Sequence, residues 1–417
     1  MSAVLFAQTI LVLLMAEYLL ETLADWLNRR RASRPLPAEF RDATSEEEYA
    51  NARAYQLEVS RLGRRQASLS LAALLIFWNL DGFARLDSWT AGISEHWLWH
   101  GLLFIGVLAL ASQVLSLPSS LYKTFSIDAR FNLNTTSAKT WLLDLAKGTL
   151  LGILLGGPLL AALLACFHIA GQSAWIWGWA ILSVFSLVLM YVAPTWLLPL
   201  FNKFSPLEEG ELRDRIVDYA RRNQFPLKDI MVMDGSKRSK RSNAFLSGFG
   251  SNRRIAFYDT LINSQGVPEL EAVLAHEVGH FKHRHIPLRL VMSLASTGIT
   301  FFLLGQFIGN PALSQAFGLA QPSIHMGLVG FMLLYTPVSL LLGLVQNWVS
   351  RVQEFQADAW SARTIADPEA MVNALKVLSR DNLANLDPHP LHVMLHYDHP
   401  PVLERIAAIR AATATAS

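Results

Sequence analysis

The fold class follows from Ile176-Trp-Gly-Trp-Ala-Ile-Leu-Ser-Val-Phe-Ser-Leu-Val-Leu-Met-Tyr-Val-Ala-Pro-Thr-Trp-Leu-Leu198, a stretch without a charged residue. A transmembrane helix needs about 20 predominantly apolar residues to cross the hydrocarbon core of a bilayer. Six further stretches have a similar apolar character, namely 4–23, 69–87, 101–121, 149–170, 288–308 and 326–348. The sequence therefore predicts an α-helical polytopic membrane protein with seven transmembrane helices.

The composition also indicates a membrane protein. Hydrophobic residues make up 52% of the 417 positions and charged residues only 16%, against about 25% charged residues in soluble proteins. A buried helix of a soluble core remains an alternative for the second stretch, which Asn79 and Asp81 interrupt. The first stretch resembles a signal sequence, but it lacks a basic region before it and carries Glu17 and Glu21, so we expect it to be retained.

The basic residues are unevenly distributed among the loops. The connections 88–100, 171–175 and 309–325 contain no Lys or Arg, whereas 33 of the 35 basic residues lie in 24–67, 122–147, 201–286 and 349–417. Because cationic loops stay on the cytoplasmic side, we expect the amino terminus outside and the loop 201–286 and the carboxyl terminus in the cytoplasm. The net charge of +2 gives no reason to expect a nucleic-acid partner.

Four regions are predicted along the chain. Five spans with their loops occupy 1–200, a cytosolic α/β insert 201–286, two further spans 287–348, and a cytosolic helical segment 349–417. The insert is expected to contain an amphipathic helix at Glu208–Asn223, strands at Asp229–Met233, Ser242–Gly250 and Arg254–Tyr258, a turn at Gly250-Ser251-Asn252, and a helix from Pro268. The single cysteine, Cys166, allows neither an intrachain disulfide nor a thiolate metal cluster.

The helix from Pro268 carries His276-Glu277-Val278-Gly279-His280, the HExxH pattern. Two histidines four residues apart lie on one helix face, so both imidazoles can reach one metal ion, and the glutamate between them can approach a water molecule there. The sequence therefore predicts a zinc site with His276 and His280 as ligands and Glu277 as the general base. His283 and His285 lack the spacing of a third histidine ligand and are interpreted as juxtamembrane surface residues.

A hydrolytic zinc site needs a third protein ligand and an open position. The segment Glu354-Phe-Gln-Ala-Asp358 places two carboxylates one helical turn apart, on one face. We expect Glu354 to bind the zinc ion and Asp358 to accept a hydrogen bond from a ligating histidine, which would make the insert a gluzincin-like metalloprotease. The alternative for both carboxylates is an ordinary solvated helix face.

Several further segments carry a resemblance to a known family. They are Tyr122-Lys-Thr-Phe-Ser-Ile-Asp-Ala-Arg-Phe131, Asn134-Thr-Thr136, Pro199-Leu-Phe-Asn-Lys203, Ser242-Asn-Ala-Phe245, His399-Pro-Pro401 and Glu404-Arg405, together with the two metal-site segments. Over nearly its whole length the chain resembles the integral-membrane type I CAAX prenyl endopeptidases. The resemblance implies seven helices around a water-filled intramembrane chamber, with the zinc site near the cytosolic boundary.

The resemblance also implies roles for individual residues. Asn243 and His399 would contact the substrate backbone or the developing oxyanion, and Arg405 would pair with an acidic residue of the Glu354 segment. A simple turn residue is the alternative for Asn243, although its strand could also be an edge strand that pairs with an extended peptide. The chamber would be lined in part by Asn79, Asp81, Gln113 and Asn347, which could equally be hydrogen-bond partners between helices.

The predicted function is that of a zinc-dependent membrane endopeptidase, which cleaves near the carboxyl terminus of peptide or protein substrates that are prenylated or membrane-associated. The arginines far outnumber the lysines, which favours a multi-pass protein of a bacterial inner membrane with its active site facing the cytoplasm and in contact with lipid. A membrane-protein quality-control metalloprotease without a prenyl requirement is the alternative. A non-catalytic channel or transporter is disfavoured, because Glu277 is intact.

Overall fold

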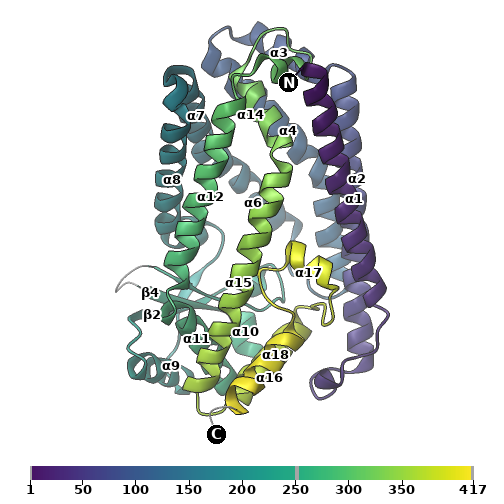
Figure 1. Cartoon of the computed structure of the whole chain (residues 1–417). Helices are drawn as coiled ribbons and strands as arrows, with labels where there is room; N and C mark the ends of the chain where they lie inside the picture. Colours follow the sequence, from purple (N-terminus) through teal and green to yellow (C-terminus); the bar gives the residue numbers. More distant parts are fainter. Residues whose placement is uncertain (1, 249–252, 415–417) are drawn as a thin grey trace.

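The structure is a computed structural model that describes residues 2–248 and 253–414. Long helices stand side by side over most of its height, and a small sheet with shorter helices lies at the end that carries the carboxyl terminus (Figure 1). The long helices are α1 (Ala3–Arg31), α2 (Glu46–Asn79), α3 (Gly82–Ile93), α4 (Trp97–Tyr122), α6 (Ala138–Leu151), α7 (Gly157–Ile169), α8 (Ala174–Val192), α12 (His285–Phe307), α14 (Ile324–Leu334) and α15 (Thr336–Thr364). The other helices are α5 (Asp128–Arg130), α9 (Glu211–Arg222), α10 (Asp259–Ser264), α11 (Val267–Lys282), α13 (Pro311–Gln315), α16 (Glu369–Asp381), α17 (Pro390–His396) and α18 (Val402–Ala414).

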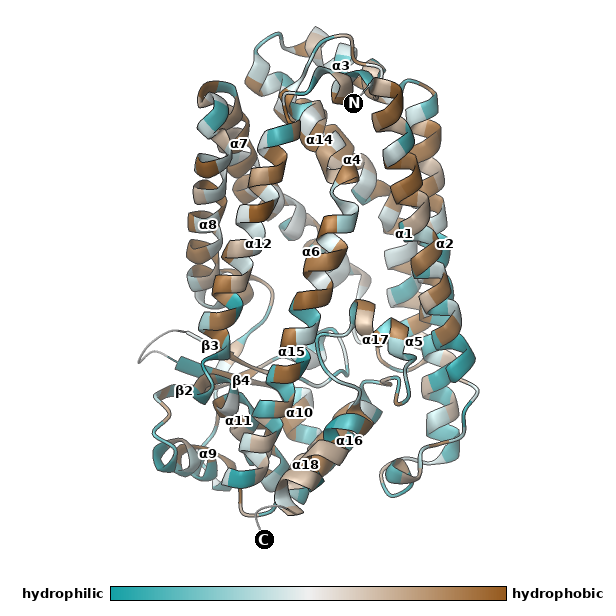
Figure 2. Cartoon of the chain, in the orientation of Figure 1, coloured by the Kyte–Doolittle hydropathy of each residue, from teal (hydrophilic) through white to brown (hydrophobic). Residues whose placement is uncertain are grey.

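All seven predicted spans fall on these long helices. Within the described residues, five helical stretches are long and apolar enough to cross a membrane, namely Ala3–Arg31, Trp97–Arg130, Ala138–Ile169, Gly171–Leu200 and His285–Phe307. Two bent pairs, α2 with α3 and α14 with α15, raise the number to seven if each pair counts as one span. Figure 2 shows hydrophobic residues along α7, α8 and α12, whereas α9 is largely hydrophilic. The polytopic helical fold is therefore confirmed.

The two bends have local causes. Between α2 and α3 the chain turns by 70° at Asp81, whose φ of 53° lies in the left-handed region and interrupts the helical hydrogen bonding. Between α14 and α15 it turns by 56° just before Pro337, which has no amide hydrogen to donate to the preceding turn. After this bend α15 continues through residue 349 to Thr364, so the last membrane helix itself carries Glu354.

Three of the four polar side chains predicted to line a chamber have hydrogen-bond partners in the protein. Gln113 donates to the Thr149 hydroxyl at 2.8 Å, which links α4 to α6. Asn347 donates to the Leu395 carbonyl at 3.0 Å, and Asn79 donates to a carbonyl in its own helix. These contacts favour the hydrogen-bonding alternative for Gln113 and Asn347. The chamber itself stays a prediction.

The insert contains the three predicted strands and one that the sequence analysis missed. The strands β1 (Phe204–Pro206), β2 (Leu227–Met233), β3 (Ala244–Ser247) and β4 (Arg253–Tyr258) form a sheet in the order β1-β2-β4-β3. Only β2 and β4 run parallel; β1 and β3 pair antiparallel with their neighbours. The predicted turn at 250–252 lies outside the described residues. The missed strand β1 is short and ends in a proline, so it carries no alternating pattern.

Contacts of two loop segments, one of them the 134–136 segment that carried the family resemblance, join the sheet domain to the membrane helices. Arg238 binds both carboxylate oxygens of Asp144 on α6, at 2.7 and 2.9 Å. Thr135 and Thr136, which follow the α4 span, form hydrogen bonds with the 236–238 segment. Because charged and backbone groups are both satisfied there, the insert is anchored to the bundle at a defined position.

The packing of α11 on α15 positions the metal-site segments. A Cβ atom at Gly279 would lie 2.9 Å from the Cα of Ala357, closer than ordinary carbon atoms can approach. Only glycine allows the two helices to come this close. The Ser361 hydroxyl also donates to the Ala272 carbonyl at 2.9 Å. The fourth residue of the HExxH pattern therefore brings the pattern against the Glu354 face.

Candidate metal centre

Three side chains converge between α11 and α15. The Nε2 atoms of His276 and His280 lie 3.2 Å apart, and each lies 3.3 Å from an oxygen of Glu354. In a tetrahedral zinc site with bonds of about 2.0–2.1 Å, the ligand atoms are roughly 3.3–3.4 Å apart. The three predicted ligands are therefore spaced to bind one metal ion.

The burial of Glu354 supports a cation at this position. Glu354 is only 1% exposed to solvent. Its Oε2 atom is buried and has no hydrogen-bond partner among the described residues. A buried carboxylate oxygen left without a partner costs free energy. Two imidazoles and one carboxylate are a donor set that zinc accepts, with a position left open, so the residues present fit the predicted ion.

Asp358 and Arg405 lie directly behind His276. Asp358 is fully buried and accepts a hydrogen bond from Nδ1 of His276 at 2.9 Å. The guanidinium of Arg405, on α18, binds both oxygens of Asp358 at 2.6 and 2.8 Å. This arrangement keeps the proton of His276 on Nδ1 and leaves its Nε2 lone pair directed at the metal position. Arg405 thus contacts Asp358, and its nearest distance to Glu354 is 3.7 Å.

The sequence interpretation of His285 as a surface residue is wrong. The chain reverses at Arg284, whose φ is 55°, and His285 is only 2% exposed. Its Nε2 lies 2.8 Å from Oε1 of Gln356, and its Nδ1 lies 2.9 Å from Nδ1 of His280. His283, by contrast, is exposed as predicted.

The contacts of His285 define the protonation of His280. If Nε2 of His285 donates to the Gln356 carbonyl oxygen, Nδ1 of His285 must accept the hydrogen bond from Nδ1 of His280. The Nε2 atom of His280 then carries a lone pair that faces the metal position. Both candidate ligand histidines are therefore held in the same tautomer, one by a carboxylate and one by a second histidine. Local spacing gave no signal for this role, because His285 lies beyond the end of α11.

Glu277 is partly buried beside these ligands. Burial raises the pKa of its carboxyl group, and the neighbouring His276 and His280 oppose this effect. A divalent cation between the histidines would also favour the ionised carboxylate, which is the form that accepts a proton. Glu277 thus combines partial solvent access with a position beside the metal ligands.

His399 and Asn243 occupy different positions relative to this centre. Nε2 of His399 lies 3.5 Å from Glu354, its Nδ1 lies 2.8 Å from Asp398, and its side chain is 54% exposed. Asn243 directly precedes β3, which lies at an edge of the sheet. Its side-chain oxygen accepts from the Ala244 amide at 2.9 Å. His399 is thus adjacent to the ligands, and Asn243 begins the edge strand.

Arg289 is a further residue near the centre that the sequence analysis did not identify. It donates to the Gln353 side chain at 2.5 Å and lies 3.5 Å from Glu354. Arg289 lies at the start of a predicted membrane span, outside the basic loops that the orientation argument used. The approach of α12 to α15 is what brings it to the carboxylate.

Two family models match the chain. "CAAX prenyl protease N-terminal, five membrane helices" covers residues 25–203, and "Peptidase family M48" covers residues 206–413. The chain is 34% identical to the CAAX prenyl protease 1 homolog of Arabidopsis thaliana, with 98% of each chain covered. It is 31% identical to CAAX prenyl protease 1 of Saccharomyces cerevisiae, with 90% of this chain and 88% of that protein covered.

A solved structure has the same fold. The crystal structure of S. mikatae Ste24p superposes with a TM-score of 0.89 at 29% identity, and the match covers 97% of this chain and 98% of the other. The similarity includes both the membrane helices and the peptidase region that holds the candidate metal centre. The chain is therefore a membrane-spanning metalloendopeptidase that belongs to the CAAX prenyl protease 1 group of peptidase family M48.

Proposed function

We propose that the protein holds zinc between His276, His280 and Glu354 and cleaves prenylated or membrane-associated substrates near their carboxyl terminus. The observation that supports this most directly is the convergence of the three side chains: the two Nε2 atoms lie 3.2 Å apart, and each lies 3.3 Å from one of the two Glu354 carboxylate oxygens. Zinc at such a site supplies Lewis acidity toward a scissile carbonyl. The residues around it provide the proton transfers and the orientation.

In this proposal Glu277 accepts the proton of the attacking water and delivers it to the leaving amine. His399, exposed and adjacent to Glu354, stabilises negative charge on the carbonyl oxygen together with Asn243. Asp358 and Arg405 orient His276. A peptide that pairs with the edge strand β3 would be extended, and its backbone would be presented to the centre by main-chain hydrogen bonds.

The location of the centre suggests how a lipidated substrate would bind. His285 begins the membrane helix α12, and Glu354 lies near the end of the membrane helix α15. An isoprenyl chain could therefore remain in apolar surroundings while the attached peptide reaches the ligands. We propose that this boundary is the cytosolic one, in a bacterial inner membrane, on the basis of the basic loops and the arginine-rich composition.

Substrate preference can be tested with paired peptides. We expect a farnesylated CAAX peptide to have a much lower apparent KM than the same peptide without the lipid, because each buried methylene-sized group contributes about 0.8 kcal/mol. Binding energy that is equal in the ground and transition states need not raise kcat. Both constants are to be measured for each peptide with purified protein in detergent.

Equal kcat/KM values for the two peptides would contradict a prenyl preference. The protein would then act as a general membrane-protein protease, as in the quality-control alternative. A catalytically disabled Glu277→Gln protein, assayed with both peptides, controls for cleavage by a contaminating peptidase.

The orientation predicts which loops impermeant thiol reagents reach. In a Cys166→Ser background, cysteines at the exposed positions Ser173 and Gln315 should be labelled from outside intact cells, and one at the exposed Ser236 should not. Ser314 in the same loop is only 1% exposed, so it is not a suitable position. Labelling of Ser236→Cys from outside would invert the proposed orientation, and permeabilised cells control for reactivity.

A further inference from the structure

A second group of metal-ligating side chains lies far from the peptidase centre. Among the described residues, two groups of at least three such side chains have their ligand atoms within 4.8 Å of one another. One is the centre described above, and the other consists of Asp87, His100 and His325. These three residues come from α3, α4 and α14, which meet at the end of the bundle opposite α11 (Figure 1).

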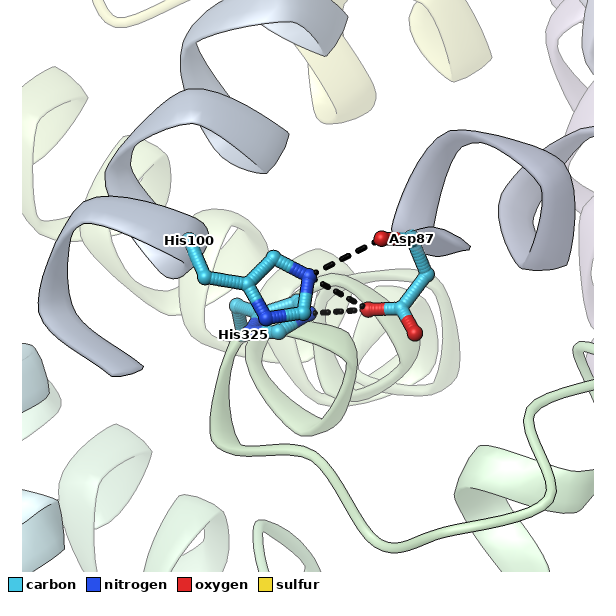
Figure 3. Close-up of side chains that lie close together, drawn as sticks. All are labelled: Asp87, His100 and His325. Atoms are coloured by element: carbon cyan, nitrogen blue, oxygen red, sulfur yellow. Dashed lines mark hydrogen bonds and ion pairs between the residues drawn. The ribbon is translucent and has the colours of Figure 1, made fainter. Parts of the chain in front are cut away.

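The two imidazoles face one carboxylate oxygen of Asp87, and Nε2 of His100 also lies 3.1 Å from the main-chain carbonyl oxygen of Asp87 (Figure 3). Nε2 of His325 lies 2.7 Å from Oδ1 of Asp87, and Nε2 of His100 lies 3.0 Å from the same atom. The rings of the two histidines are close together, with centroids 4.5 Å apart. Two ring nitrogens and a carboxylate oxygen from three helices therefore converge on one small volume.

We propose that Asp87, His100 and His325 bind a divalent zinc-type ion. Imidazole nitrogen and carboxylate oxygen together suit zinc, and three protein ligands leave one position for water or a further group. Ligand atoms around tetrahedral zinc are roughly 3.3–3.4 Å apart. The two Nε2–Oδ1 distances, 2.7 and 3.0 Å, are shorter, so the carboxylate would have to withdraw by about half an ångström when the ion replaces the ring protons.

The surroundings of the three residues favour a site over a solvated surface cluster. The side chains of His325, His100 and Asp87 are 8%, 17% and 25% exposed. Phe104, which is fully buried, packs with its ring centroid 4.7 Å from that of His325. An apolar wall beside partly accessible ligands limits competition from water, while an entry path from solvent remains.

This site is separate from the peptidase centre. α12 runs from the peptidase end to the opposite end of the bundle, and its 23 residues correspond to roughly 35 Å. His325 lies after the far end of that helix, at the start of α14. A bound ion would connect α3, α4 and α14, where the second candidate span ends and the third and seventh begin. It would thereby link helices that are distant in sequence.

The zinc content of the full-length protein in detergent tests the site. After treatment with chelator, reloading with Zn²⁺ and removal of free metal, wild-type protein should retain two zinc ions per chain. Asp87→Asn and His100→Ala should each retain one, because each removes a ligand of the second site only. His168→Ala is the matched control, since His168 is an exposed histidine that stacks on Trp97 of α4, and it should retain two.

A Co²⁺ titration gives an independent measurement if a variant fails to fold. The double variant His276→Ala/Glu354→Ala removes two peptidase ligands and leaves the second group intact. It should bind one Co²⁺ with the visible absorption of a tetrahedral site, and this absorption should disappear when Asp87→Asn is added. One zinc per wild-type chain together with no Co²⁺ absorption in the double variant would overturn the proposal and leave a hydrogen-bonded cluster.

Discussion

Glu277→Gln is expected to leave the zinc content unchanged and to lower kcat by about 10²–10⁴-fold or more, the range for loss of a general base. Glutamine has nearly the same shape but cannot accept the proton of the attacking water. The metal should stay, because Glu277 is not one of the three converging ligands. Zinc analysis and turnover of a fluorogenic peptide, measured on the same preparation, separate the two effects.

Glu269→Gln provides the matched control for this substitution. Glu269 lies in the first turn of the same helix, α11, so the chemical change is identical and the position is remote from the ligands. It should leave both zinc content and kcat near the wild-type values. Turnover by Glu277→Gln close to that of Glu269→Gln would remove Glu277 from the mechanism.

Glu354→Ala is expected to abolish activity by removing metal. The substitution takes away the only carboxylate among the three ligands and leaves two imidazoles, which are too few for a stable hydrolytic site. The loss of zinc affinity should exceed the roughly 10–100-fold expected when a residue that hydrogen-bonds a ligand is substituted, as in Asp358→Asn. Competition with a chromophoric zinc chelator measures the affinity of each variant.

The same measurement compares the exposed His283 with the buried His285, which contacts His280. His283→Ala should leave zinc affinity nearly unchanged, because the side chain is exposed. His285→Ala should weaken it by roughly 10–100-fold, since His285 holds the tautomer of His280. Loss of metal from His283→Ala with retention by Glu354→Ala would show that the third ligand is assigned wrongly.

Features with a local cause were predictable from the sequence. A membrane span depends on the summed hydrophobicity of about 20 consecutive residues, so the apolar stretches that lie on the long helices could be located without knowledge of their neighbours. The HExxH pattern and the Glu354–Asp358 pair depend on helical spacing alone, since residues four apart share a face. Their approach to each other was an expectation from chemistry, and the glycine at 279 makes it sterically possible.

Other features depend on where separate segments meet. His285 lies two residues after the exposed His283, but the left-handed residue Arg284 between them turns the His285 side chain into the interior. The length of α15 was also not predicted. The helix packs on the insert and continues to Thr364, well beyond its apolar part.

The cluster of Asp87, His100 and His325 shows most clearly what only the tertiary structure decided. Each of these residues is a single polar position near the end of an apolar stretch, and no spacing connects 87 and 100 with 325. They become neighbours because α3, α4 and α14 pack together, and that packing is set by the shapes of many apolar side chains. Hydropathy and helical periodicity determine which segments become membrane helices and which face carries the HExxH ligands, whereas long-range packing determines which distant side chains share a site.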